Sequence, residues 1–276
     1  MKFIAQKSLR KKISASLEAI TCSVSAATSN LGTGASLGIN VVRDWIVPPT
    51  CLMCDAIVVQ PGGCCSKCWG TIRFVARPYC EVLGSPFSYD MGQGAVCADA
   101  IANPPPFNRA RAAVLYDDPI RRLISGLKYS DRLDVAPWIA KWMARAGRQL
   151  IEENPIVIPV PLYKTRLLTR RFNQSAEIAR TICKDKNLEY RPQALKRIRK
   201  TKQQVGLSRQ ERAQNVSGVF IVPPEYGAEL KGKSILLIDD VLTTGATVSS
   251  AAKALNRVGV ASVDVLTFAR VESFDM

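Results

Sequence analysis

The sequence contains no histidine among its 276 residues. This absence excludes Ser-His-Asp and Cys-His catalytic triads, HExxH zinc proteases and iron centres with two histidine ligands. No stretch reaches the ~18 uninterrupted apolar residues that a membrane span requires. We therefore expect a cytoplasmic protein without a membrane span, in which any metal site is built from cysteine, aspartate or glutamate.

The composition is that of a globular protein, with 47% apolar and 22% charged residues, and the length allows one large or two modest domains. The net charge is +15 and is unevenly placed. Between Lys164 and Arg212, fifteen lysines and arginines accompany four acidic residues, a net charge of +11. Such density predicts a polyanionic partner, either a nucleic-acid backbone or a phosphorylated small molecule, with a solvated basic face as the alternative.

Seven of the nine cysteines lie within residues 51–97, which favours a metal site over scattered disulfides. Two Cys-x-x-Cys pairs, separated by a turn containing Pro61, Gly62 and Gly63, have the spacing of a tetrahedral zinc site. The predicted ligands are Cys51, Cys54, Cys65 and Cys68. Buried apolar cysteines or a redox pair are the alternatives, and Cys64 could replace Cys65.

The chain is predicted to have three parts. Residues 1–46 are basic and rich in serine and alanine, and are expected to be helical rather than an export signal. Residues 47–108 are rich in cysteine, glycine and proline, as in a zinc ribbon, and end near a triple proline. In residues 109–276, apolar strands alternate with amphipathic helices, which predicts an α/β domain with a mainly parallel sheet flanked by helices. The expected strands are 112–116, 156–160, 219–222, 235–238 and 263–268. One helix is expected to begin at residue 119, and three further helices are expected over 136–151, 173–184 and 247–258.

The segment from Ser234 to Thr247, SILLIDDVLTTGAT, carries the strongest motif. Two adjacent carboxylates follow a buried strand at its carboxyl end, where α/β proteins place ligands. A threonine- and glycine-rich turn then opens a helix, whose amino terminus favours a phosphate group. A ribose 5-phosphate satisfies both features, since it offers vicinal hydroxyls and a phosphate.

This segment resembles the phosphoribosyl diphosphate (PRPP) signature of type I phosphoribosyltransferases. The resemblance implies that Asp239 and Asp240 bind the ribose 2- and 3-hydroxyls. It implies that Thr243, Thr244, Gly245, Ala246 and Thr247 bind the 5-phosphate, and that Val241 and Leu242 belong to the same PRPP-binding segment. The family's pyrophosphate-binding turn is similar to Pro159, Val160, Pro161 and Leu162, with Lys164, Arg170 and Arg171 close behind.

Arg199, Lys200 and Lys202 occupy the place where such enzymes carry a mobile lid. A basic lid would close over a ligand with about four negative charges and support a departing diphosphate. The alternative is a solvated run of charge.

From about residue 45 to Arg270, the order of motifs resembles the ComF-type competence-protein family: a cysteine-rich region, RARAAVLY, LKYSDRLD, PVPLYKTRLLTRRFNQ and the PRPP strand. The resemblance implies a zinc ribbon fused to a phosphoribosyltransferase domain, and a link to uptake of single-stranded DNA. The family often carries two further Cys-x-x-Cys pairs, but here Leu83 and Ala100 stand at the partner positions of Cys80 and Cys97. We therefore expect one structural zinc ion.

The expected activity is Mg²⁺-dependent transfer of a phosphoribosyl group from PRPP to an unknown acceptor. The alternative is a non-catalytic protein that handles single-stranded DNA and uses PRPP as a regulatory ligand; a nucleotide-sensing regulator is a weaker alternative. The expected partners are PRPP, single-stranded DNA and other DNA-uptake proteins.

Overall fold

The computed structural model describes residues 48–60, 62–129, 135–163, 172–201, 211, 214–216 and 218–272. The chain divides into two compact units, Met1–Pro49 and Thr50–Met276, and all elements named below belong to the second. The helix expected in residues 1–46 lies outside the described residues. The domain boundary expected at residue 108 stays a prediction. Among the described residues, no helix is long and apolar enough to cross a bilayer.

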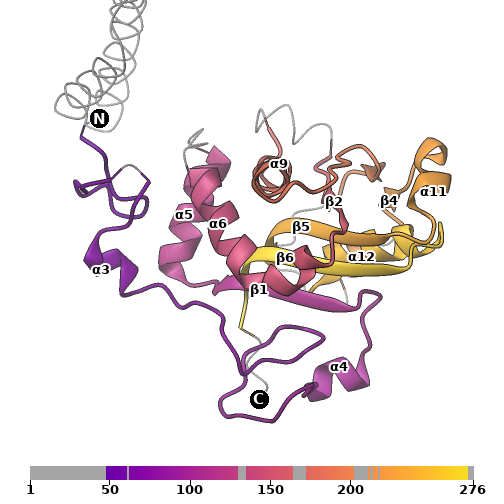
Figure 1. Cartoon of the computed structure of the whole chain (residues 1–276), viewed down its shortest axis with the longest axis horizontal. Helices are drawn as coiled ribbons and strands as arrows, with labels where there is room; N and C mark the ends of the chain where they lie inside the picture. Colours follow the sequence, from indigo (N-terminus) through magenta and orange to yellow (C-terminus); the bar gives the residue numbers. More distant parts are fainter. Residues whose placement is uncertain are drawn as a thin grey trace, which may run out of the picture. The chain divides into compact units, whose positions relative to one another are not determined.

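A four-stranded parallel sheet forms the centre of the second unit, in the order β1-β6-β5-β2 (Figure 1). Its strands are β1 (Arg109–Leu115), β2 (Ile156–Pro159), β5 (Ser234–Leu242) and β6 (Ser262–Arg270). Two further short strands, β3 (Lys196–Arg197) and β4 (Phe220–Ile221), pair in an antiparallel ribbon. The predicted α/β class with a parallel sheet is therefore confirmed.

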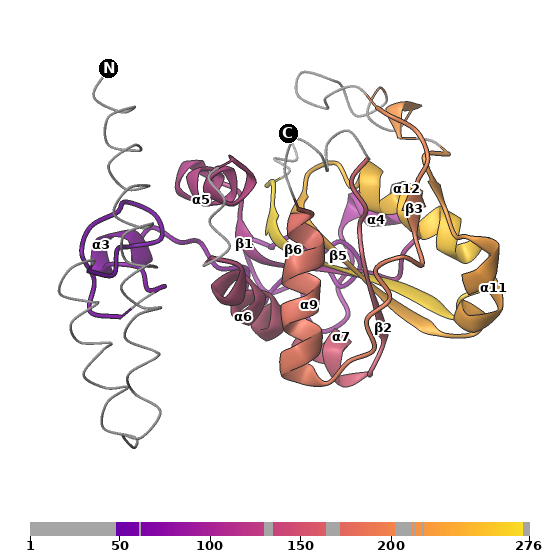
Figure 2. The same ribbon diagram turned by 90° about the horizontal axis from the view of Figure 1, so that it is seen from above.

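Helices cover both faces of this sheet, as the views in Figures 1 and 2 agree. One face packs against α6 and α9, and the other against α12. The helices are α3 (Ser66–Trp69), α4 (Ala98–Ala102), α5 (Asp118–Tyr129), α6 (Ala136–Ala146), α7 (Arg148–Glu152), α9 (Gln174–Lys186), α11 (Pro224–Leu230) and α12 (Ala246–Asn256).

The side chains of β5 are apolar on both faces of the sheet, and this explains why helices cover both faces. Successive side chains of a strand point to opposite faces. Leu236 and Ile238 pack in one core with α6 and α9, whereas Ile235 and Leu237 pack in a second core with α12. All four side chains are at most 1% exposed. A strand buried on both faces reads as a continuous apolar run, which is the pattern from which it was predicted.

The helix expected over 136–151 is two helices, because α6 ends at Ala146 and α7 begins at Arg148. Gly147 lies between them, and a Cβ atom there would be 2.6 Å from Cδ2 of Leu266 on the sheet. A side chain at this junction would displace the side chain of Leu266 on β6, which favours glycine there.

Residues 50–69 and 79–102 are two segments that begin with a turn of the same geometry. They are named here the first ribbon and the second ribbon. In the first, the amide of Cys51 donates to the carbonyl of Ala56 at 2.7 Å, and in the second, the amide of Cys80 donates to that of Ser85 at 2.8 Å. An isolated bridge follows the same offset in each, Thr50 to Ile57 and Tyr79 to Pro86.

The two ribbons also share a left-handed residue and a cysteine at the start of a helix. Asp55 has φ 61° and Gly84 has φ 66°, each four residues after the first cysteine. Cys65 precedes α3, and Cys97 precedes α4. The sequence shows this repeat only in part, since the second ribbon keeps Cys80 and Cys97 but lacks the second cysteine of each pair.

Both ribbons contact the α/β core of the same unit. A Cβ atom on Gly62 would lie 1.6 Å from Nε1 of Trp138 on α6, so only glycine allows this approach. The segment between the ribbons pairs with the free edge of β1 through an antiparallel bridge from Phe74 to Val114. The second ribbon follows along the same strand, where the amide of Ala110 donates to the carbonyl of Val82 at 2.7 Å.

Candidate functional site

The paired carboxylates lie within β5 rather than just after it. The strand was expected to end at Ile238, but it runs through both aspartates to Leu242 because β6 continues to pair alongside, with Asp239 opposite Thr267. Each carboxylate is oriented by a neighbouring amide: Asp240 donates to Oδ1 of Asp239 at 2.9 Å, and Val241 donates to Oδ1 of Asp240 at 2.8 Å. Both side chains are half-buried.

The turn of residues 243–247 leads from β5 into α12. Gly245 has φ 75° at the N-cap of the helix and provides no side-chain cap. The hydroxyl of Thr244 is buried and has no hydrogen-bond partner among the described residues. An uncapped helix amino terminus beside an unpaired buried hydroxyl is an arrangement that an anion completes, since both the amides and the hydroxyl need an acceptor.

The start of α9 lies next to the first aspartate. Asn173 caps this helix by accepting from the amide of Ser175 at 3.1 Å, and its side-chain amide donates to the carbonyl of Val160 at 3.0 Å. The hydroxyl of Ser175 donates to Oδ1 of Asp239 at 3.0 Å. Gln174 is 2% exposed, and its Nε2 has no partner among the described residues.

Sequence reasoning missed these three residues as members of the site. The signal was local, since an asparagine at a helix start predicts a cap. Asn173 is more than sixty residues before the aspartates in the sequence, so the cap signal did not indicate that the two lie close together. The asparagine cap joins the loop after β2 to α9, and the serine joins α9 to β5.

The turn expected to bind pyrophosphate begins at the end of β2. Pro159 closes the strand, and the amide of Val160 donates to the carbonyl of Ile238 at 2.9 Å, which places the turn beside the end of the apolar part of β5. Pro161 and Leu162 follow in irregular structure and are half-buried. Lys164, Arg170 and Arg171 lie outside the described residues.

The expected lid is described only at its beginning. Arg199 and Lys200 follow β3 and are exposed, whereas Lys202 lies outside the described residues. Several cations of the basic stretch are already paired: Arg180 with Glu177, Arg191 with Glu189 and Glu229, and Lys196 with Glu225. These pairs reduce the charge that this surface offers to a polyanion.

A cavity of about 710 Å³ is lined in part by residues 243–246 of the turn. Its walls come from this turn, from α12, from the second ribbon and from the segment of prolines that follows α4. They include the exposed cations Lys253 and Arg257 and the buried Arg270. The second ribbon and the turn that leads into α12 therefore line the same cavity.

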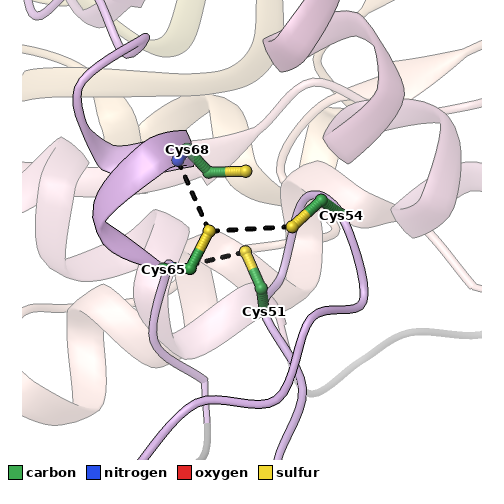
Figure 3. A group of neighbouring side chains, drawn as sticks. All are labelled: Cys51, Cys54, Cys65 and Cys68. Atoms are coloured by element: carbon green, nitrogen blue, oxygen red, sulfur yellow. Dashed lines mark hydrogen bonds between the residues drawn. The ribbon is translucent and has the colours of Figure 1, made fainter.

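The four predicted zinc ligands come together in the first ribbon (Figure 3). Their Sγ atoms all lie within 4.8 Å of one another, and those of Cys54 and Cys65 are 3.7 Å apart. Zinc–sulfur bonds of about 2.3 Å require sulfur atoms about 3.8 Å apart at the corners of a tetrahedron. The donor set therefore fits zinc. Cys64 stands outside this group and packs against the first core.

Hydrogen bonds within the first ribbon favour a thiolate at Cys51. Burial raises the pKa of this thiol, but the amides of Cys65 and Met53 donate to it and bring the pKa down to about 6. Burial raises the pKa of the Cys64 thiol to about 11. Zinc binds the thiolate, so the hydrogen bonds to Cys51 suit its place among the four ligands. Cys64 is separated from the ligands by its position outside the sulfur cluster.

The second ribbon keeps the fold without four sulfurs. Leu83 packs against the second core, and Ala100 is 5% exposed. The guanidinium of Arg270 reaches into the ribbon, where it donates to the carbonyl of Leu83 and to the hydroxyl of Ser85. Arg111 holds the adjoining residue through the carbonyl and carboxylate of Glu81. Hydrogen bonds, an ion pair and apolar packing thus hold the second ribbon in place.

Comparison with known proteins finds family models that match two regions of the chain. A model of the double zinc ribbon domain matches residues 42–101, and a model of the phosphoribosyl transferase domain matches residues 191–273. The chain is 26% identical over 226 residues to competence protein F of Haemophilus influenzae, covering 80% of this chain and 96% of that protein.

Two other relatives span similar lengths. The DNA utilization protein YhgH of Escherichia coli K12 is 29% identical over 233 residues, covering 81% of this chain and 98% of that protein. Competence protein ComFC of Bacillus subtilis is 25% identical over 240 residues, covering 80% and 94%. The chain has a four-cysteine ribbon, followed by a parallel sheet that carries a threonine- and glycine-rich turn. It belongs to the ComF/YhgH family of proteins that join a double zinc ribbon to a phosphoribosyltransferase domain.

Proposed function

We propose that this protein binds PRPP at the carboxyl end of β5 and transfers its phosphoribosyl group to an acceptor. The observation that carries the proposal is the 243–247 turn. There the buried hydroxyl of Thr244, which has no partner among the described residues, adjoins the uncapped amino terminus of α12. A 5-phosphate accepts hydrogen bonds from both, and the helix dipole favours its charge.

Asp239 and Asp240 take the ribose in this proposal. Their carboxylates precede the 243–247 turn on the same strand, so a sugar whose phosphate occupies the turn would extend toward them. Carboxylates accept hydrogen bonds from vicinal hydroxyls, and the amides of Asp240 and Val241 hold the two groups in fixed orientations. Ser175 adds a third hydrogen bond to this arrangement through Oδ1 of Asp239.

The pyrophosphate group is assigned to the turn after β2, Pro159 to Leu162, with Lys164 and Arg171 as its cationic partners. The amino terminus of α9 supports this assignment, because Asn173 ties it to the carbonyl of Val160. The buried Nε2 of Gln174 is a further donor in the same part of the fold.

Magnesium fits the oxygen-rich chemistry of these groups, since it prefers carboxylate, phosphate and water oxygens. When bound with PRPP it would neutralise charge on the diphosphate. The reaction breaks the bond between ribose C1 and the diphosphate oxygen and forms a bond from C1 to the acceptor nucleophile. Diphosphate leaves with the bonding electron pair, and Arg199, Lys200 and Lys202 are proposed to stabilise it.

The test is to incubate the zinc-loaded protein with labelled PRPP and Mg²⁺, alone and with a panel of bases, amines and single-stranded DNA. Calorimetry should detect PRPP binding, and at least one acceptor should release pyrophosphate in step with transfer of the label. Binding without release for every acceptor would support a regulatory role for PRPP. No binding at all would contradict the proposal.

A second proposed function is the handling of single-stranded DNA, favoured by the names of the relatives and by the exposed basic residues that follow β3. Arg199 and Lys200 are exposed there, and Lys184 and Lys186 are exposed at the end of α9. We rank this function second because ion pairs occupy several neighbouring cations. Other DNA-uptake proteins would then be partners.

A further inference from the structure

The second ribbon retains two of the four sulfurs that a zinc site needs, and these two remain adjacent. The backbone of Cys97 lies directly against the thiol of Cys80. The amides of Leu83 and Cys97 also donate to Sγ of Cys80, at 3.4 Å and 3.3 Å. The same contacts surround Cys51 in the first ribbon, where the amides of Met53 and Cys65 donate at 3.4 Å and 3.3 Å.

No third metal ligand accompanies this pair in the part of the chain that the structure describes. The four cysteines of the first ribbon are the one group of three or more potential ligands found there. Leu83 and Ala100 fill the positions of the missing sulfurs with carbon. Since two thiolates alone hold zinc poorly, both thiols stay available for other chemistry.

A buried cation reaches into the same ribbon. Arg270 is 5% exposed and donates to the carbonyl of Leu83 and to the hydroxyl of Ser85. Its positive charge attracts the thiolate forms of Cys80 and Cys97, and the thiolate is the nucleophile in thiol chemistry. The amide hydrogen bonds that Cys80 accepts outweigh burial and lower its pKa, whereas burial raises the pKa of Cys97. Cys80 is therefore the better thiolate of the two, and Cys97 is the more accessible thiol.

We infer that Cys80 and Cys97 form a redox-active dithiol that small disulfides, such as oxidised glutathione, convert reversibly to an intrachain disulfide. Cys80 is fully buried and Cys97 is half-buried, so the oxidant meets Cys97 first. This inference does not depend on the proposed transfer reaction.

The exchange takes two balanced steps. The thiolate of Cys97 attacks one sulfur of the small disulfide, which forms a mixed disulfide and releases one small thiolate. The thiolate of Cys80 then attacks the sulfur of Cys97, which forms the intrachain bond and releases the second small thiolate. Two cysteine thiols are oxidised, one small disulfide is reduced, and the two protons pass to the released thiolates.

The bond would close a loop that borders the cavity beside the 243–247 turn. Leu83 follows Cys80 by three residues and Asp99 follows Cys97 by two, and both line the cavity together with Arg270. Oxidation therefore modifies the wall of this cavity and leaves the zinc ligands of the first ribbon untouched.

The test treats zinc-loaded full-length protein with oxidised glutathione, blocks remaining thiols with N-ethylmaleimide, and maps peptides without reduction. We expect a Cys80–Cys97 cross-linked peptide, two fewer alkylated cysteines, unchanged zinc content, and reversal by dithiothreitol. The matched control is Cys183→Ser, which removes a cysteine that is 5% exposed and whose burial raises its pKa to about 12. This variant should form the same cross-link.

Two variants keep the result interpretable. Cys97→Ser should abolish the cross-link while the protein stays folded by circular dichroism. Leu83→Cys combined with Ala100→Cys rebuilds the ligand set, and should raise the zinc content from one ion to two and block the cross-link. The inference is overturned if wild-type Cys80 and Cys97 stay alkylatable after oxidation, or if both are already protected by a second zinc ion.

Discussion

Ser175→Ala isolates the hydrogen bond that joins α9 to the proposed ribose site. The serine is 4% exposed, and its hydroxyl donates to Oδ1 of Asp239 at 3.0 Å. Without it, that oxygen keeps the bond from the amide of Asp240 at 2.9 Å, so the carboxylate remains held from one side only. Hydrogen bonds to charged groups contribute about 1.5–3 kcal/mol.

If half of that contribution orients the carboxylate for the ribose, PRPP affinity should fall by roughly 0.8–1.5 kcal/mol, which is about fourfold to twelvefold in Kd. Calorimetry with Mg²⁺ and PRPP measures this change directly, and urea unfolding measures stability in parallel. The matched control is Thr181→Ala on the same helix, whose hydroxyl donates to the backbone carbonyl of Glu177. It should leave PRPP affinity unchanged. Equal losses in both variants, or none in a folded Ser175→Ala protein, would refute the reasoning.

Three further predictions concern the ribbons and the basic surface. Purified protein should hold about one zinc ion by elemental analysis, lost when Cys51 and Cys54 become serine but kept in Cys183→Ser. Gly62→Ala places a Cβ atom 1.6 Å from Nε1 of Trp138 and should destabilise the protein by more than about 2 kcal/mol in urea unfolding; Gly227→Ala, where nothing lies within 4 Å, should not. Binding of single-stranded DNA should weaken with salt at a log–log slope of about −0.7 per phosphate neutralised. The double variant Lys200→Ala, Lys202→Ala should chiefly slow turnover if these residues form a lid. If single-stranded DNA instead binds strongly at ~0.15 M salt and competes with PRPP, the DNA strand occupies the lid region.

The sequence predicted the main parts of the fold because their signals are local. The apolar run 235–238 is recognisable as a strand buried on both faces, and Leu236 and Leu237 indeed face different cores. The Cys-x-x-Cys pairs fix a sulfur geometry by spacing alone, and the cluster in the first ribbon confirms it. Both conclusions needed only a few consecutive residues.

Other features depend on contacts between distant segments. The place of Ser175 beside Asp239 follows from how α9 packs against β5, which no local pattern reports. The sequence placed leucine and alanine at the partner positions of Cys80 and Cys97, but it did not report whether this segment still folds as a ribbon. The hydrogen bonds of Cys80 and the left-handed Gly84 show that it keeps the geometry of the first ribbon. Arg270, at the end of β6, reads in sequence as an ordinary strand terminus.

The most direct test of the account is PRPP binding to the double variant Asp239→Asn, Asp240→Asn. Amide side chains keep the size of the carboxylates while removing their charge and half of their acceptor capacity. Thermal unfolding should show a folded protein, and calorimetry with Mg²⁺ should show that PRPP binding, clear in the wild type, is abolished. Unchanged PRPP affinity in the folded double variant would contradict the claim that these two residues bind the ribose.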